Sequence, residues 1–290
     1  MRLLRRGCYR KGDFREGVLD SGFHATEHSG RREIRKQKHK RDAGRSGAAH
    51  APDPPPSRKQ LERELASVAD PKRAAFVAGY FKTGKGEYGE GDRFLGITVP
   101  VLRQIAHRYV ALQFDDLTRL LASPIHEHRV AALEILVAQY ERGDEDRRER
   151  IVAFYLRHTR AMNNWDLVDT AAPYILGEHL KTRPRQLLDR LAASRSLWER
   201  RIAIISTLAL IRAGEIGDTF RIAKKLLSDE HGLIHKAAGW ALRETDKVSR
   251  ASLVAFLRKH YSALPRTTLR YAIERFPAAQ RKRMLAGKFN

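Results

Sequence analysis

Residues 197–214 read LWERRIAIISTLALIRAG, and this stretch decides the fold class. Its apolar residues recur at three- and four-residue spacing over about five turns, which indicates a helix with a buried face. Gly214 follows the last apolar position, where glycine commonly ends a helix. We therefore expect one long helix here, packed against neighbours of the same kind.

The segments on both sides of this stretch repeat the pattern. Asp70-Pro71, Ser123-Pro124 and Leu264-Pro265 are typical helix starts, and no convincing strand alternation appears. The sequence thus predicts an all-α fold, a HEAT-like stack of helix pairs forming a curved solenoid with a basic concave face; an irregular helical bundle is the alternative. The same spacing occurs at 57–70, 114–123, 129–141, 148–159, 185–194, 219–229, 233–245 and 252–261.

Charge divides the chain and narrows its partners. The 290 residues include 56 Lys+Arg and 34 Asp+Glu, a net charge of +22, which is typical of proteins that bind nucleic acid. Residues 1–58 contain RREIRKQKHKR (31–41) and few clustered apolar residues. We predict a basic, disordered tail over 1–58, either a DNA arm or a dispensable extension, and one folded domain over 59–290.

Several other site classes are not supported. Cys8 is the only cysteine, so neither an internal disulfide nor a cysteine-based zinc site is possible, and no run of about 18 apolar residues exists. GYFKTGKG (79–86) lacks the Ser/Thr of a phosphate-binding loop. The histidines of HEHR (126–129), His231 and His235 lack metal-site companions and are interpreted as surface residues. We expect no metal, no cofactor, no membrane contact and a cytoplasmic location.

Residues 163–173, NNWDLVDTAAP, place a tryptophan and an aspartate one helical turn apart. At about 100° per residue, Trp165 and Asp169 lie about 40° apart. Leu167, Ala171 and Tyr174 fall on the opposite side, which we take as the core face. Trp165 and Asp169 are then expected to face outward together. The alternative is a tryptophan packed under a neighbouring helix, with Asp169 as a surface residue or cap.

A second tryptophan lies in IHKAAGWALRE (234–244), away from the apolar face of its helix. Trp240 is flanked by Lys236 and Arg243, an arrangement suited to a sugar-phosphate chain. Arg201 lies within an otherwise apolar helix and needs a carboxylate or a bound phosphate, unless it only extends to solvent. Trp165 precedes Arg201 by 36 residues and Arg201 precedes Trp240 by 39, so a repeat of about this length could gather them on one surface.

At these residues the sequence resembles a known family. NNWDLVD (163–169), LWERRIAI (197–204), HKAAGWALRE (235–244) and FLGITVPVLRQI (94–105) are similar to segments of the HEAT-like DNA alkylation repair glycosylases, the AlkD family. The resemblance covers roughly 65–276, and the tail has no counterpart. It implies a monofunctional, metal-free and cofactor-free DNA repair glycosylase of base excision repair. Such a hydrolase would release N3- and N7-alkylated purines from duplex DNA without deep base flipping, as a monomer at the bacterial nucleoid.

The resemblance also implies roles for individual residues. The catalytic tryptophan and aspartate fall on Trp165 and Asp169, the phosphate-contacting arginine on Arg201, and the second tryptophan on Trp240. Two rivals stay open: a non-catalytic HEAT-like scaffold that binds nucleic acid or protein, and a family member that has lost activity. Further candidate DNA contacts are Lys236, Arg243, Arg200 and Lys85, the last in a glycine-rich loop that is otherwise a solvated connector.

Overall fold

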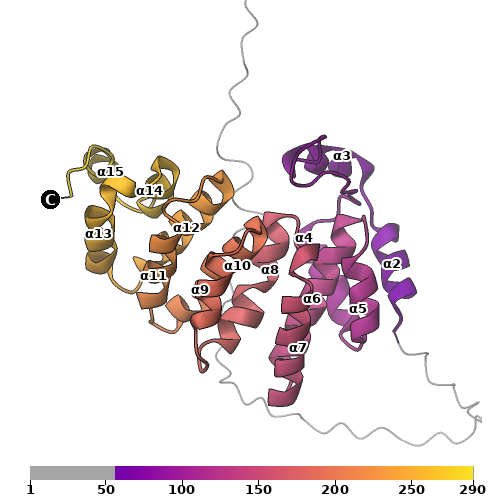
Figure 1. Cartoon of the computed structure of the whole chain (residues 1–290). Helices are drawn as coiled ribbons and strands as arrows, with labels where there is room; N and C mark the ends of the chain where they lie inside the picture. Colours follow the sequence, from indigo (N-terminus) through magenta and orange to yellow (C-terminus); the bar gives the residue numbers. More distant parts are fainter. Residues whose placement is uncertain (1–55, 290) are drawn as a thin grey trace, which may run out of the picture. The chain divides into compact units, whose positions relative to one another are not determined.

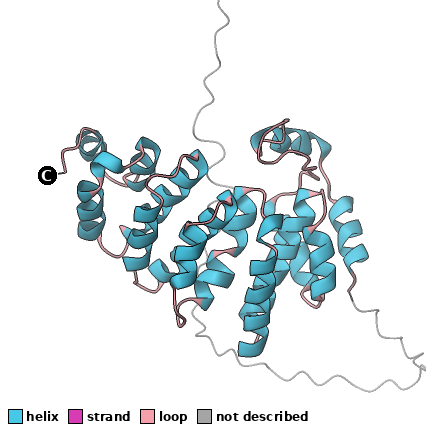
Figure 2. Ribbon diagram, in the orientation of Figure 1, coloured by secondary structure: helices cyan, strands magenta, loops and turns pink. Residues whose placement is uncertain are grey.

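The computed structural model describes residues 56–289, which form a series of helices joined by loops (Figure 1). Helices and loops make up this part of the chain (Figure 2), with one isolated bridge between Arg93 and Ile125. The helices are α2 (Arg58–Ser67), α3 (Pro71–Tyr80), α4 (Val99–Ala106), α5 (Phe114–Leu121), α6 (His126–Arg142), α7 (Glu145–Arg157), α8 (Trp165–Ala171), α9 (Gln186–Ala192), α10 (Leu197–Arg212), α11 (Gly217–Lys225), α12 (Gly232–Thr245), α13 (Arg250–Lys259), α14 (Arg266–Ala272) and α15 (Ala278–Leu285).

The predicted fold class is confirmed as all-α and solenoid-like. Each of the nine segments with helical periodicity contains a helix, and the short links between them include 3-10 turns. None of the helices within residues 56–289 combines the length and apolar character needed to cross a bilayer. The HEAT assignment and the basic concave face stay predictions, as does the tail, since residues 1–55 lie outside the described part of the chain.

Local sequence sets the helix boundaries. The Asp70 carboxylate accepts hydrogen bonds from the backbone N–H groups of Lys72 and Arg73 at 2.9 and 3.1 Å, with Pro71 as the first helical residue. The expected start is therefore confirmed there. Gly214 follows α10 with φ of 84°, a left-handed conformation that glycine adopts without strain.

Two helices form the centre of the described unit. Every residue of α6 from His126 to Tyr140 is buried, as is every residue of α10 from Arg201 to Ile211. Helix α10 packs on α8, α9, α11 and α12, while α6 packs on α4, α5, α7 and α8. Burying each large aliphatic side chain contributes about 1.5–3 kcal/mol. Charged residues that begin these helices are consequently carried into the interior and need partners there.

The helix that carries Trp165 changes its geometry soon after Asp169. Helix α8 ends at Ala171, and a π-helical turn follows at Pro173–Gly177. Leu167 and Ala171 are fully buried, as predicted. Tyr174 instead lies at the edge of the core with the Arg212 guanidinium 5.2 Å from its ring centre. The wider π turn changes the angular step per residue, so a wheel drawn at 100° no longer applies beyond Ala171.

Gly239 allows α12 to lie close against α14. A Cβ atom at this position would come within 2.5 Å of the Tyr271 Cβ and 2.7 Å of the Thr268 carbonyl oxygen. We expect Gly239→Ala to lower the free energy of unfolding by about 1–3 kcal/mol, because the backbone must shift to relieve the overlap. Gly232→Ala, in the same helix but with no heavy atom within 4 Å, is the control. Equal denaturation midpoints for the two variants would contradict this account.

Candidate active site

Asp169 of α8 and Arg201 of α10 form a bidentate ion pair. Arg201 Nε donates to Asp169 Oδ1 at 2.9 Å, and Nη2 donates to Oδ2 at 2.7 Å. The side chains are 14% and 6% exposed, respectively. The carboxylate is therefore neither a surface residue nor a helix cap, as the alternative interpretation had it, but it keeps some contact with solvent. Such a pair fixes both the position and the orientation of the carboxylate.

The third nitrogen of Arg201 joins a third helix. Nη1 donates to the carbonyl oxygen of Leu233, in the first turn of α12, at 2.9 Å. These bonds use three of the five N–H donors of a guanidinium. Of the partners considered from the sequence, the carboxylate is thus the one that the structure places beside Arg201. Contact with a phosphate stays a prediction for the remaining donors.

The charge state of Asp169 reflects two opposing influences. Burial raises the pKa of the Asp169 carboxyl above that of an ordinary aspartate, and the neighbouring Asp166 adds to this rise. The Arg201 guanidinium opposes it and favours the ionised form. The bidentate bonds from Arg201 are thus the interaction that favours the ionised form of this carboxylate.

Trp165 begins α8 and lies at the end of a column of stacked rings. Its indole stacks on Phe81, just after α3, with 5.4 Å between ring centroids. Phe81 stacks in turn on Phe94 at 5.2 Å, and Phe94 on His126 at 4.6 Å. The indole is half-buried. The prediction that Trp165 faces outward therefore holds only in part, because one face of its indole packs on the segment that precedes α4.

Two tyrosines lie edge-on to tryptophan rings near this site. Tyr80 lies edge-on to the indole at 6.2 Å, and Tyr88 lies edge-on to Trp198 at 5.7 Å. Burial raises the pKa of Tyr80, and the nearby Tyr271 and Asp166 raise it further. Tyr80 is consequently within electrostatic range of both α8 and α14.

Trp240 lies on α12, half-buried and packed against the core. It follows Gly239, the point of close approach to Tyr271. Within residues 56–289 no hydrogen bond, ion pair or ring contact joins it to Trp165, Asp169 or Arg201. The structure thus brings Asp169 and Arg201 into contact one turn after Trp165, and Arg201 reaches the first turn of the helix that carries Trp240.

The interpretation of HEHR (126–129) as surface residues is wrong. All four side chains are buried because α6 is central. His126 Nε2 lies 2.6 Å from Asp166 Oδ2 and Nδ1 lies 3.3 Å from Asp92 Oδ2. Arg129 also pairs with Asp92, at 2.5 Å, and donates to Asn163 Oδ1 at 2.9 Å.

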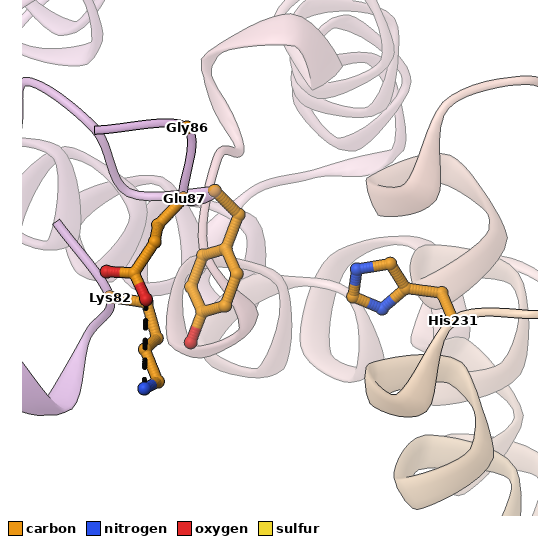
Figure 3. Close-up of a pocket in the computed structure, with 5 residues that line it drawn as sticks. Lys82, Gly86, Glu87 and His231 are labelled. Atoms are coloured by element: carbon orange, nitrogen blue, oxygen red, sulfur yellow. Dashed lines mark ion pairs between the residues drawn. The ribbon is translucent and has the colours of Figure 1, made fainter. Parts of the chain in front are cut away.

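A pocket opens between the loop after α3 and the start of α12. It has a volume of about 410 Å³ and is lined by Lys82, Gly86, Glu87, Tyr88 and His231. Lys82 and Glu87 form an ion pair of 3.7 Å on one side, and His231 lies on the other (Figure 3). His231 also caps α12 by accepting a hydrogen bond from the Leu233 N–H. A ligand in this pocket would meet both segments.

Comparisons with known proteins assign the chain to a family. Residues 61–276 match the family described as DNA alkylation repair enzyme. The chain belongs to this family. The solved structure of a predicted DNA alkylation repair enzyme from Enterococcus faecalis is similar to it, with a TM-score of 0.56 and 17% identity over 72% of this chain and 97% of that one. At that identity the likeness concerns the fold alone. No curated protein sequence matches the chain.

The cations predicted to contact DNA in this alkylation repair enzyme fall into two groups. Lys85 and Lys236 are exposed and form no ion pair within the described residues. Arg200 Nε instead pairs with Asp229 at 2.5 Å, and Arg243 pairs with Glu274. The lysines are therefore free to meet phosphates, whereas the arginines already hold neighbouring segments together. DNA contact by all four stays a prediction.

The buried histidine gives the alkylation repair enzyme a pH-dependent stability. Burial alone lowers the pKa of His126, but Asp166 and Asp92 outweigh it and raise the pKa from 6.5 to about 9. The stabilisation from protonated His126 is complete below pH 6.5 and is lost as the pH rises through about 9. We expect the free energy of unfolding to fall by up to about 3 kcal/mol across this window. Denaturant titrations at pH 6.5 and 9.5 measure it, and His126→Gln should lack the fall.

Proposed function

We propose that this DNA alkylation repair enzyme is a monofunctional glycosylase. It hydrolyses the N-glycosidic bond of cationic N3- and N7-alkylated purines in duplex DNA, without flipping the base deeply. The observation that carries the proposal is the Asp169 carboxylate, held by Arg201 one helical turn after the half-buried indole of Trp165. The +22 net charge supports a polyanionic substrate.

The chemistry of the lesion explains why a single carboxylate suffices. An N3- or N7-alkylpurine already carries positive charge, so it leaves as a neutral base without a general acid. Positive charge instead develops on the deoxyribose in the transition state, as in other glycosidic cleavages. A fixed carboxylate can stabilise that charge and orient the attacking water. The bonds from Arg201 favour the charged form of Asp169 and give it the rigid attachment that this role needs.

The neighbouring groups complement the carboxylate. The indole faces of Trp165 and Trp240 offer further attraction to a cationic sugar, worth on the order of 0.5–2 kcal/mol each. Arg201 fixes Asp169 and keeps two N–H donors for a backbone phosphate. Lys85 and Lys236 add exposed positive charge for DNA binding.

Release of base from methylated duplex DNA tests the proposal. The full chain is incubated with such DNA, and free 7-methylguanine is quantified against a no-protein reaction. Multiple-turnover release supports glycosylase activity. Binding of the duplex without release would contradict it and favour the non-catalytic scaffold. Salt dependence of binding does not separate the two, because every basic DNA binder shows it.

Neutral lesions should be poor substrates. Uracil leaves as an anion unless a group donates a proton, and proton transfer of this kind contributes about 10²–10⁴-fold in enzymes. No such donor is assigned in the proposed mechanism, so we expect uracil release at least on the order of 10²-fold slower than 7-methylguanine release from matched duplexes. Comparable rates with the purified protein would contradict the assignment of Asp169 as the sole reacting group.

A further inference from the structure

His126 bridges two carboxylates from separate segments of the chain. Its ring nitrogens face Asp166 Oδ2 at 2.6 Å and Asp92 Oδ2 at 3.3 Å, and the residue is 2% exposed. Asp166 follows Trp165 directly in the first turn of α8. Asp92 lies in the segment between α3 and α4. A protonated imidazole can donate to both carboxylates at once.

The surrounding groups make protonation necessary for charge balance. Arg129 is the other cation beside Asp92, and Asn163 donates to Asp92 Oδ1 at 2.9 Å. Two carboxylates, one guanidinium and one imidazolium together carry no net charge. A neutral imidazole would leave one negative charge uncompensated at a site with little access to solvent, which is unfavourable.

The segment that Asp92 anchors carries the rings beside Trp165. Phe81 and Phe94, on either side of Asp92 in the chain, stack between Trp165 and His126. The end of this segment is fixed as well, since the Glu127 carboxylate accepts the N–H groups of Leu95 and Gly96 at 2.9 and 2.7 Å. The bridge through His126 is therefore a direct polar link from this segment and α6 to the first turn of α8, beside the bond that the Asn164 side-chain amide donates to the Phe81 carbonyl oxygen at 3.4 Å.

We propose that protonated His126 is a positioning residue, a buried clasp between Asp92 and Asp166 that holds segment 81–94 against α8 and so fixes Trp165 and Asp169. The clasp acts through its neighbours and does not touch substrate. Its effect on excision rests on the proposed function, whereas its effect on Trp165 does not.

Loss of the His126 proton should open the clasp on one side. A neutral ring donates from one nitrogen only, so the link to either Asp92 or Asp166 is lost. The charged groups that face the ring are Asp92 from the segment before α4, Arg129 from α6 and Asp166 from α8. Because the pKa of His126 is raised to about 9, the change in the surroundings of Trp165 should be centred near that pH.

Tryptophan fluorescence tests the clasp independently of catalysis. A Trp198→Phe/Trp240→Phe background leaves Trp165 as the only tryptophan in the chain. We expect a fluorescence transition near pH 9 in this background. His126→Gln should abolish it, and His128→Gln should keep it. His128 is the matched control, because it is buried in the same helix but bonds to Ser123 instead. A transition that persists in His126→Gln, or that disappears equally in both variants, overturns the proposal.

Two further measurements complete the design. In the otherwise unchanged chain, His126→Gln should lower single-turnover release of 7-methylguanine about tenfold or more with DNA affinity within about twofold, because small misplacement of reacting groups is costly. His128→Gln should leave the rate unchanged. If neither the parent nor any variant releases base while the fluorescence pattern holds, the proposed function fails and the clasp stands. If His126→Gln does not fold, Asp166→Asn should move the fluorescence midpoint to lower pH; an unmoved midpoint overturns the clasp.

Discussion

Asp169→Asn should lower single-turnover excision of 7-methylguanine by about 10²–10³-fold, the range seen when one electrostatic stabiliser is removed from an enzyme. The amide keeps the shape of the carboxylate and one acceptor for Arg201, but it loses the negative charge that the sugar cation requires. DNA affinity should change by less than about threefold, because the charge acts in the transition state rather than on bound duplex.

Asp189→Asn is the matched control for this variant. Asp189 also pairs with an arginine, Arg221, but on α9 and with 29% of its side chain exposed. It should leave excision unchanged. Rates for Asp169→Asn equal to those of the parent protein would refute the catalytic role of this carboxylate. Circular dichroism of both variants checks that the comparison is between folded proteins.

Arg201→Met should lower the free energy of unfolding by about 3–5 kcal/mol at pH 7, the usual result of removing one partner from a buried ion pair. The substitution leaves the Asp169 carboxylate 14% exposed without its cation, and it removes the donor to the Leu233 carbonyl. Adding Asp169→Asn to this variant should recover part of the loss, because the uncompensated charge is then gone. Strictly additive losses in the double variant would argue against a coupled pair.

The same variant should gain more stability on acidification than the parent protein does. Without Arg201, only burial and Asp166 act on Asp169, and both raise its pKa in the folded chain above the value in the unfolded chain. A group of this kind favours the folded state when protonated, so the stability deficit of Arg201→Met should be smaller at pH 4 than at pH 7. Urea titrations at the two pH values, each compared with the parent protein, measure the difference.

The fold could be predicted from the sequence because its signal is local. The apolar spacing of 197–214 and 129–141 depends only on residues within one helix, and both segments became central helices. The wheel drawn from Trp165 failed at Tyr174, since a π turn that packs on α10 follows at Pro173–Gly177. A helical wheel takes no account of packing between helices.

The site could be predicted only in part, because its partners are distant in sequence. The sequence indicates that Arg201 needs an anionic partner. Whether that partner is a carboxylate or a phosphate depends on how α8 faces α10. His126 was misinterpreted, since its partners lie 34 and 40 residues away. The sequence does carry one signal: the helix over 129–141 has apolar residues on every side, which indicates a central helix whose charged first turn is buried too.

Phe81 covers one side of the Trp165 indole, and this limits how any guest can approach. The ring cannot be sandwiched between two parts of a nucleotide, because one of the two stacking surfaces is already taken by the protein. A bound sugar or base must stack on the one remaining face, so the protein fixes the direction of approach before the ligand binds.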